Sequence, residues 1–389
     1  MKSINISTNS NFNGRFYLLD LARAVAAICV VLQHYQHFYF IAPHVYQDNF
    51  VRSQQPLYET IKPFYLFGPV AVQFFFVLSG FIFFFMYKDM IFSKSISFKN
   101  FIILRLSRLY PLHLLTLFIM LFLQLYYNYL NDSYFIYEEN NLKNFLLHIL
   151  LIQEWGLVAS QWAFNAASWS ISVEFLLYIV FFYVALIGIK NLFQSILSLI
   201  IAFILFVIIQ PEATNLMVGF VCFYIGGVTY FFYIHLKKII NIDKTTKILT
   251  LFFLIILNVI IFGRFLNSYF LTLQNNLEFL IGDRFLLLLY FVKFPLIILT
   301  LALMQNFFNN LGKSLKLLGD MSYTIYLVHV PVEIIYSIID TQIIKINYDS
   351  NYFFLIYFVT IFLFSFVIFA FFEIPLKKFI RKKLIKKII

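Results

Sequence analysis

Long apolar segments alternate with short polar ones along the whole chain. Each apolar segment has about 19 to 25 residues, which is enough for a helix to cross a hydrocarbon core of about 30 Å at 1.5 Å per residue. The pattern therefore predicts an all-α integral membrane protein with ten transmembrane helices. These cover residues 17–41, 69–87, 109–130, 166–189, 192–210, 213–235, 248–266, 285–303, 321–340 and 352–374.

One further apolar segment, at about 143–158, is shorter and carries His148 and Glu154. A segment of this kind does not span a bilayer on its own, but it can lie at the interface or re-enter the membrane where protein surrounds it. We therefore expect one short interfacial or re-entrant helix there.

Lysines and arginines fall mostly on one side of this layout. With the N-terminus in the cytoplasm, 21 of the 29 basic residues lie in inside segments and six in outside segments. Because basic loops stay in the cytoplasm, both termini are predicted to be cytoplasmic. The chain is then a single transmembrane domain over residues 1–389, with a short cytoplasmic N-terminus at 1–16 and a basic cytoplasmic tail at 375–389.

Composition supports this class and excludes others. Hydrophobic residues make up 62% of the chain and aromatic residues 21%, more than a soluble domain usually carries. The net charge is +11, but the charged residues lie between apolar segments rather than on one soluble face. No nucleic-acid partner is therefore expected. With two cysteines, no HExxH spacing, no GxSxG and no Walker loop, the sequence supports no metal site, serine hydrolase or ATP-driven pump.

Two ionisable residues of the first span stand out. Arg23 and His34 are eleven positions apart, about 16 Å along a helix and close to three turns, so they project from one face. Ionisable groups inside a membrane are costly and usually functional. The simpler alternative is an arginine that reaches the interface and a histidine satisfied within the bundle.

Further polar groups lie at depth in the fourth and ninth spans. Glu174 follows Ser168, Ser170 and Ser172, and it could neutralise and orient a protonated His34 or act as an acid or base itself. The serines could equally bond to carbonyls of their own helix.

In the ninth span, His329 lies nine positions beyond Asp320, with Tyr323 between them. His329 is again near mid-depth, although packing alone would also explain it.

Two arginines mark the cytoplasmic end of the third span. Arg105 and Arg108 are one helical turn apart and therefore share a face. Guanidinium groups bind phosphate oxygens in a bidentate manner, so this pair suits phosphate binding, although ordinary anchoring at the membrane surface is the alternative. In the second span, Ser79 and Gly80 favour close helix packing.

Taken together, these motifs resemble the membrane-bound acyltransferase family 3, whose members modify carbohydrates. The resemblance covers nearly the whole chain in order. It is carried by LDLARAVAAICVVLQH, FFFVLSGF, RLSRLYP, SWSISVE, LGDMSYTIYLVHVPV and FFEIPLKK. Isoleucine at position 171 replaces the leucine that is usual after the Trp-Ser pair, a conservative change.

The resemblance implies an enzyme of the bacterial inner membrane, of the type without an appended hydrolase-like domain. Such an enzyme moves an acyl group, usually acetyl, from cytoplasmic acyl-CoA to a hydroxyl of an envelope or surface polysaccharide. O-antigen, capsule and exopolysaccharide are candidate acceptors. Its partners are then acyl-CoA, a glycan or lipid-linked glycan, and membrane lipid.

The site residues take roles within this hypothesis. Arg105 and Arg108 bind the CoA phosphates, and Arg23 holds a phosphate or the pantetheine arm. His34 acts as general base or accepts the acyl group, and Glu174 orients it. His329 is the third expected catalytic residue, and together with Tyr323 it could contact the acceptor sugar or the thioester carbonyl. The residues expected to contact substrate or support the site are Asp20, Ser79, Ser170, Ser172 and Tyr323.

Two other functions remain open from sequence. A transporter or flippase for a lipid-linked sugar or a small anion could use the same intramembrane His, Glu and Arg residues as a proton relay, although no internal repeat supports it. A purely structural bundle would leave the ionisable residues at mid-membrane depth unexplained.

Overall fold

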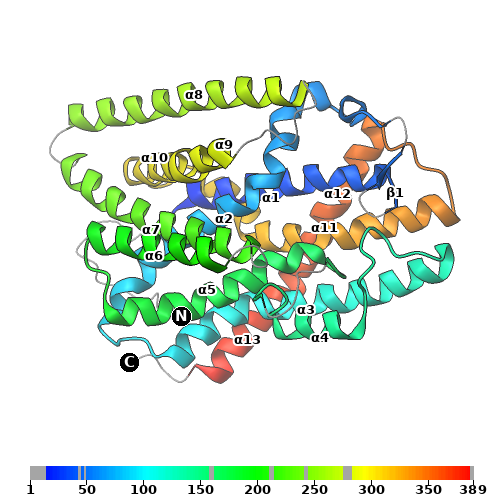
Figure 1. Cartoon of the computed structure of the whole chain (residues 1–389), viewed down its shortest axis with the longest axis horizontal. Coiled ribbons are helices and arrows are strands. Elements are labelled where there is room, and N and C mark those ends of the chain that lie inside the picture. The colour runs from blue at the N-terminus through cyan, green and yellow to red at the C-terminus, as the bar shows by residue number, and fades with distance from the viewer. Residues whose placement is uncertain are drawn as a thin grey trace.

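The computed structural model describes residues 15–42, 45–47, 50–156, 162–209, 214–240, 244–274 and 283–385. The first fourteen residues and the last four of the predicted basic tail therefore lie outside the described part, as do residues 157 and 158 of the predicted interfacial segment. Most of the long helices run along the longest axis of the molecule (Figure 1).

The described chain is almost entirely helical. The α-helices are α1 Tyr17–His34, α2 Tyr58–Phe92, α3 Phe98–Asn131, α4 Leu142–Leu150, α5 Trp169–Ile187, α6 Leu192–Ile209, α7 Thr214–Ile240, α8 Lys244–Gln274, α9 Asp283–Leu288, α10 Phe294–Phe307, α11 Lys316–Gln342, α12 Asn351–Ile368 and α13 Ile374–Leu384.

Short elements connect these helices. Single π-helical turns, η5 Leu289–Lys293 and η7 Phe369–Glu373, join α9 to α10 and α12 to α13. The 3-10 turns within the described residues are η1 Tyr35–Tyr39, η2 Arg52–Gln54, η3 Ala166–Ser168 and η6 Lys313–Leu315. Strands β1 Phe40–Ala42 and β2 Val45–Tyr46 form a small antiparallel hairpin in which Phe40 pairs with Tyr46.

Eight helical segments within the described residues are long and apolar enough to cross a membrane. They correspond to eight of the ten predicted spans, so the all-α membrane fold is confirmed. The other two predicted spans lie in α6 and α8, whose apolar parts, Leu192–Leu205 and Thr245–Ile260, are shorter. The number ten therefore stays a prediction.

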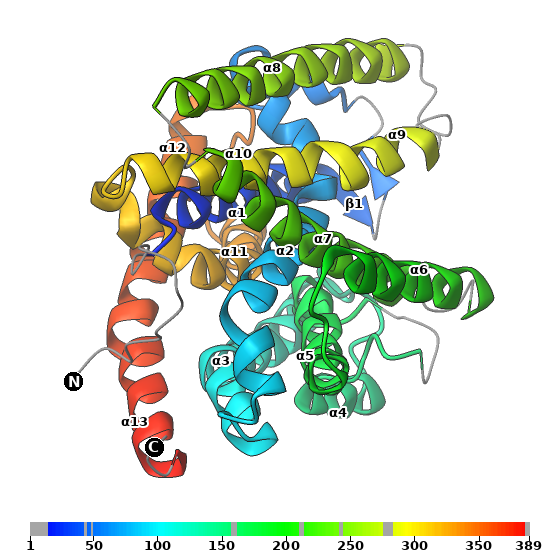
Figure 2. The same cartoon turned by 90° about the vertical axis from the view of Figure 1, so that its left-hand side faces the viewer.

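The directions of α5 and α7 show how α6 runs through the bundle. Helices α5 and α7 run the same way, because Val173 lies beside Gly219 and, further along both helices, Phe181 lies beside Phe223. The chain must therefore return along the bundle between them, and α6 is the helix that does so. In Figure 2, α8 lies at the outside of the bundle, where it packs on α10.

The short apolar segment at 143–158 forms a helix of only nine residues, α4, followed by turns. Its length of about 14 Å is too small to cross a bilayer. The prediction of a helix that does not span is confirmed, and the helix ends at Leu150, before the predicted limit.

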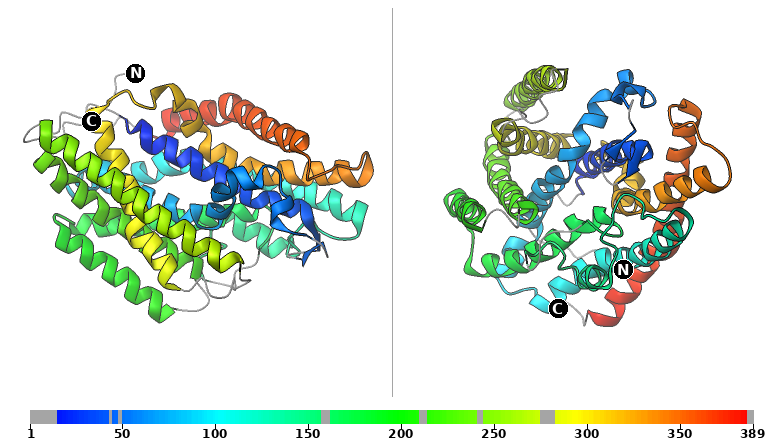
Figure 3. Two further views of the ribbon diagram at one scale, coloured as in Figure 1. Left: turned by 90° about the horizontal axis from the view of Figure 1, so that it is seen from above. Right: turned by 45° about the vertical axis from the view of Figure 1, so that its right-hand side comes forward.

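Helix α1 lies inside the bundle, between α2 and α11, with α10 also against it (Figure 3). It runs parallel to α11: near one end Asp20 meets Gly319, and near the other His34 meets His329. Parallel packing of two distant segments is what brings the polar residues of the first and ninth predicted spans together.

Helices α2 and α7 approach each other closely. A Cβ on Gly80 would overlap the carbonyl oxygen of Phe223, and one turn further along both helices Gly227 lies against Phe84. Glycine thus permits this approach, as expected for small residues between membrane helices.

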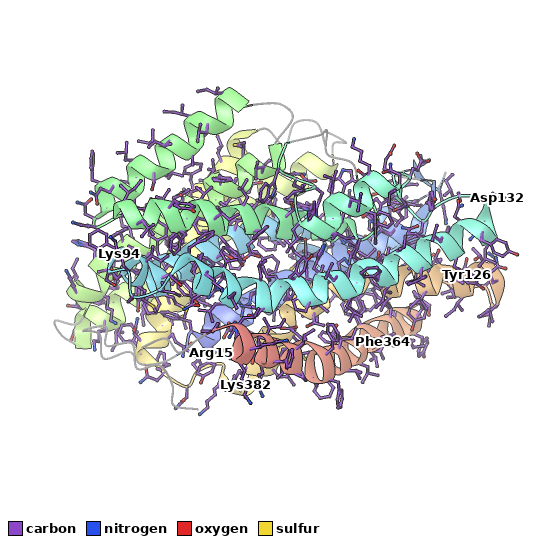
Figure 4. All side chains as sticks on the ribbon, turned by 90° about the horizontal axis from the view of Figure 1, so that it is seen from below. Arg15, Lys94, Tyr126, Asp132, Phe364 and Lys382 are labelled. Carbon is purple, nitrogen blue, oxygen red and sulfur yellow. The ribbon has the colours of Figure 1, made fainter. Side chains whose placement is uncertain are left out.

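The ends of the bundle carry different side chains. Lys94, Arg15 and Lys382 lie toward one end, and Asp132 and Tyr126 lie at the other (Figure 4). The first three belong to segments predicted to be cytoplasmic, so we call their end the basic end.

Candidate active site

A cavity opens among α1, α2, α3, α5 and α11, with a volume of about 840 Å³ including its mouth. Apolar side chains such as Val72, Phe75 and Ile82 form part of its wall. The polar residues that line it are Arg23, Ser79, Arg105, Arg108, Ser170, Glu174, Tyr178, Ser322, Tyr323 and Tyr326. The structure therefore brings together predicted site residues from five separate segments.

Positive charge dominates this cavity. Arg23, Arg105 and Arg108 line it, and Glu174 is the single carboxylate among its lining residues. The Nε atoms of Arg23 and Arg105 are buried without a hydrogen-bond partner among the described residues. Buried donors without partners are costly, and three guanidinium groups around one cavity favour the binding of an anion there.

Aromatic rings hold Arg105 in place. Its guanidinium lies over the ring of Phe83 at 4.9 Å and over that of Tyr87 at 4.4 Å, and it also donates to the Tyr87 hydroxyl. Stacking on aromatic faces fixes the orientation of the guanidinium, so Arg105 is positioned before any ligand arrives.

Ion pairs fix the arginines near the basic end. Asp20 on α1 accepts bonds from both Arg15 and Arg23, and Arg15 also bonds to Asp320 on α11. Arg23 donates further to the carbonyl of Gly319, at 3.3 Å. Partial burial lowers the pKa of Arg15, but its bonds to Asp320 and Asp20 outweigh this effect and raise the pKa above its ordinary value.

A pair of histidines lies further along the same two helices. Nδ1 of His34 and Nε2 of His329 are 2.6 Å apart, and the ring planes differ by 13°. This separation is too short for stacked faces, so the rings meet edge to edge and share one proton in an N–H···N bond. His329 is fully buried, whereas His34 is partly exposed.

A buried carboxylate supports the histidine pair. Glu333, one turn beyond His329, accepts from His37 at 2.8 Å and from the Tyr357 hydroxyl at 3.0 Å. The ring of His37 stacks on that of His34 with centroids 4.7 Å apart. Glu333 is fully buried, and its carboxylate lies within 4.8 Å of the facing nitrogens of His34 and His329.

The structure places Glu174 in the arginine cavity. Its carboxylate accepts from Ser79 at 3.2 Å and lines the arginine cavity. The carboxylate beside His34 belongs to Glu333 instead. Residue spacing predicts how far along its helix each residue lies. It does not predict how one helix is rotated against another.

Other predicted supporting residues divide into two groups. Ser79, Ser170 and Tyr323 line the cavity, and Tyr323 donates to the carbonyl of Leu109 at 2.8 Å. Ser172 lies elsewhere: its hydroxyl bonds to the carbonyl of Leu151 and the amide of Glu154. Ser172 therefore holds the turns after α4 and is not among the residues that line the cavity.

Tyr326 connects the cavity with the histidine pair. It lines the cavity, and its ring centroid is 6.1 Å from that of His329. Its hydroxyl is held by the carbonyl of Ala167 at 2.6 Å and by Ser170 at 2.9 Å. A ligand that extends from the arginines toward His34 would therefore pass beside Tyr326.

Comparison with known proteins identifies the family of the chain. The model of acyltransferase family 3, described as an acyltransferase domain, matches residues 16–370. The chain belongs to this family. No curated protein and no solved structure matched the chain.

The matched region of this membrane acyltransferase includes the whole arginine cavity, the histidine pair and Glu333. Sequence reasoning missed Glu333, although it lies four residues after His329 and therefore on the same helix face. It also missed His37, which reaches the site only because α1 continues into the 3-10 turn η1.

His34, His329 and Glu333 also have donor types that bind metals. Two nitrogens on one tetrahedral zinc would be roughly 3.3 Å apart, given Zn–N bonds of about 2.0 Å. The 2.6 Å separation of His34 and His329 is shorter, so the pair as it lies fits a shared proton rather than a metal.

A second pair of buried histidines packs α3 against α4. Nε2 of His113 lies 2.8 Å from the carbonyl of His148, and Nδ1 of His148 lies 2.8 Å from the carbonyl of Asn144. Burial lowers the pKa of His148 to about 4, against an opposing effect of its bond to Asn144. These contacts are structural, because neither histidine lines the arginine cavity.

Proposed function

We propose that this membrane acyltransferase moves an acyl group, in the simplest case acetyl, from cytoplasmic acyl-CoA to a hydroxyl of an envelope or surface polysaccharide at the inner membrane. The observation that carries the proposal is the cavity with three guanidinium groups, whose lining includes residues of α1 and α11, the two parallel helices that also carry the histidine pair. Residues of an anion site and of a proton-accepting site therefore lie along the same pair of helices.

The positive charge of the cavity supports acyl-CoA as the acyl donor. CoA carries its phosphate groups at one end of a long, thin pantetheine arm and its thiol at the other. It therefore matches a cavity that has arginines toward the basic end and apolar walls beyond them. Arg105 and Arg108 bind phosphates, and Arg23 binds a phosphate or the start of the arm. The eleven residues from Arg23 to His34 correspond to about 16 Å along α1, the path over which the arm brings the thioester beside Tyr326 toward His34.

The tautomer of the histidine pair decides which nitrogen of His34 can act as the base. Nδ1 of His329 is buried without a partner among the described residues, and of the two tautomers open to the pair we take the one in which Nδ1 of His34 donates its hydrogen. Nε2 of His329 then accepts from Nδ1 of His34. In consequence Nε2 of His34 has a free lone pair, and it lies on a residue that is partly exposed.

In the proposed reaction the acyl group moves directly from the sulfur of CoA to the sugar oxygen. Nε2 of His34 takes the proton of the sugar hydroxyl while the hydroxyl oxygen attacks the thioester carbonyl carbon. The C–S bond breaks, the ester forms, and the proton on His34 passes to the CoA thiolate. Glu333 stabilises the positive charge on His34 during this step, because its carboxylate is close and buried. In the alternative route, His34 takes the acyl group first and passes it to the hydroxyl.

The donor site is tested by acetyl-CoA binding to purified protein, measured by calorimetry. The double variant Arg105→Ala with Arg108→Ala should raise Kd about 100-fold, since two charge-assisted contacts are lost. Lys99→Ala is the matched control: it removes a charge from the same helix, but from an exposed side chain outside the cavity. Equal Kd values for the double variant and the control would refute the assignment.

A further inference from the structure

A second, smaller pocket lies at the far end of α1 from the basic end. Its volume is about 320 Å³ including its mouth and the open space that adjoins it. It is formed where η1, η2 and the start of α2 meet. Its lining residues are Gln33, Gln36, Arg52, Gln55, Tyr58, Tyr65, Leu66 and Pro69.

Polar side chains with unused hydrogen-bonding capacity line this pocket. Gln55 is 4% exposed and Tyr58 is 7% exposed, yet neither the Gln55 amide nor the Tyr58 hydroxyl bonds to another residue in the described part of the chain. The same holds for the Gln33 amide. Gln55 and Tyr58 are buried as residues, but their polar atoms are not among the buried atoms without a partner in the described structure. These atoms are therefore open to the pocket, where a ligand or water can pair with them.

The chemistry of the lining selects for hydroxyl groups. A glutamine amide offers a donor and an acceptor side by side, and a tyrosine hydroxyl offers both on one atom. Three amides together with the neighbouring rings of Tyr58 and Tyr65, 5.7 Å apart, combine hydrogen bonding with aromatic faces. This combination suits a compact, hydroxyl-rich ring such as a sugar unit.

The position of the pocket relates it to His34. Gln33 and Gln36 lie one turn apart at the end of α1 and in η1, and His34 lies between them in sequence. Successive residues on a helix point about 100° apart. His34 faces α11, whereas Gln33 packs against Gly68 on α2. The pocket therefore lies on the flank of α1 next to the histidine, at the end opposite the arginines.

We propose that this pocket binds a sugar unit of the acceptor glycan adjacent to the unit that is acylated. The inference rests on the function proposed above and adds to it an anchoring subsite. Gln55 and Tyr58 hold hydroxyl groups of the anchored sugar, and the next sugar of the same chain presents its hydroxyl to Nε2 of His34.

The test uses Gln55→Leu, which keeps the size of the side chain and removes its hydrogen bonds. The matched control is Gln54→Leu, one residue away on an exposed side chain outside the pocket. The acceptor is surface polysaccharide extracted from a strain that lacks the gene, titrated with radiolabelled acetyl-CoA. Gln55→Leu should raise the acceptor KM about tenfold, as expected for one lost contact, with the KM for acetyl-CoA unchanged.

A stability measurement separates binding from folding. Because the Gln55 amide has no partner in the described structure, Gln55→Leu should leave the thermal midpoint in detergent unchanged or higher. A clear drop in that midpoint would identify Gln55 as a structural residue and overturn the proposal. So would an acceptor KM equal to that of Gln54→Leu. If the wild-type protein acetylates none of the extract, the proposed polysaccharide acceptor fails, and the anchoring subsite fails with it.

Discussion

The hydrogen bond between His34 and His329 allows a quantitative prediction. His329→Leu removes the acceptor of the 2.6 Å bond while keeping an apolar side chain in a fully buried position. A neutral hydrogen bond contributes about 1 kcal/mol, and a bond to a charged group about 1.5 to 3 kcal/mol. The bond gains this charge only when His34 takes a proton in the transition state, so its loss acts on kcat.

The expected result is a 10- to 100-fold fall in kcat for acetyl transfer, which corresponds to about 1.4 to 2.7 kcal/mol of barrier. The KM for acetyl-CoA should not change, because His329 does not line the arginine cavity. His329→Gln is the control, since its amide oxygen can take over the acceptor role, and it should recover most of the lost activity. A His329→Leu enzyme with normal protein level and kcat within twofold of wild type would refute the role given to this pair.

Three further predictions concern stability, measured as thermal unfolding of the purified protein in detergent. Folding lowers the pKa of His148 from 6.5 to about 4. As the pH falls, the unfolded chain therefore binds a proton at His148 before the folded chain does. The stability is full above pH 6.5, and about 3 kcal/mol of it is lost between pH 6.5 and 4. His148→Gln should remove this part of the pH dependence, and an identical pH profile would contradict the assignment. Gly80→Val should cost about 3 kcal/mol, because its side chain would overlap the carbonyl of Phe223. Gly263→Val is its control, since a Cβ there meets no atom within 4 Å, and equal midpoints for the two variants would argue against the α2–α7 contact. Ser172→Ala should cost about 1 to 3 kcal/mol through its lost bonds to the turns after α4. Acetyl-CoA binding by this variant should stay normal, and weakened binding would return Ser172 to the substrate site.

The sequence predicted the elements of the site better than their contacts. Hydropathy and charge gave the spans and the basic end, because both follow from the chain crossing a bilayer. Helical spacing put Arg23 with His34, and Arg105 with Arg108, on common faces. The structure agrees, since Arg23 and His34 both meet α11, and both α3 arginines line one cavity.

Contacts between distant segments could not be predicted in the same way. The rotation of α5 about its axis decides whether Glu174 faces Ser79 or His34, and no residue spacing within α5 encodes it. His37 and Gln55 depend on 3-10 turns and loops, where apolar periodicity gives no signal. Glu333 is different, because its spacing of four residues from His329 was a usable signal.

The central claim is that His34 is the residue at which acyl transfer takes place. The most direct measurement is transfer of radiolabelled acetyl from acetyl-CoA to extracted surface polysaccharide by purified His34→Ala protein, with its acetyl-CoA affinity measured in parallel. Our account predicts that transfer is lost while acetyl-CoA still binds through Arg105 and Arg108. Transfer at the wild-type rate by a correctly folded His34→Ala protein would contradict it.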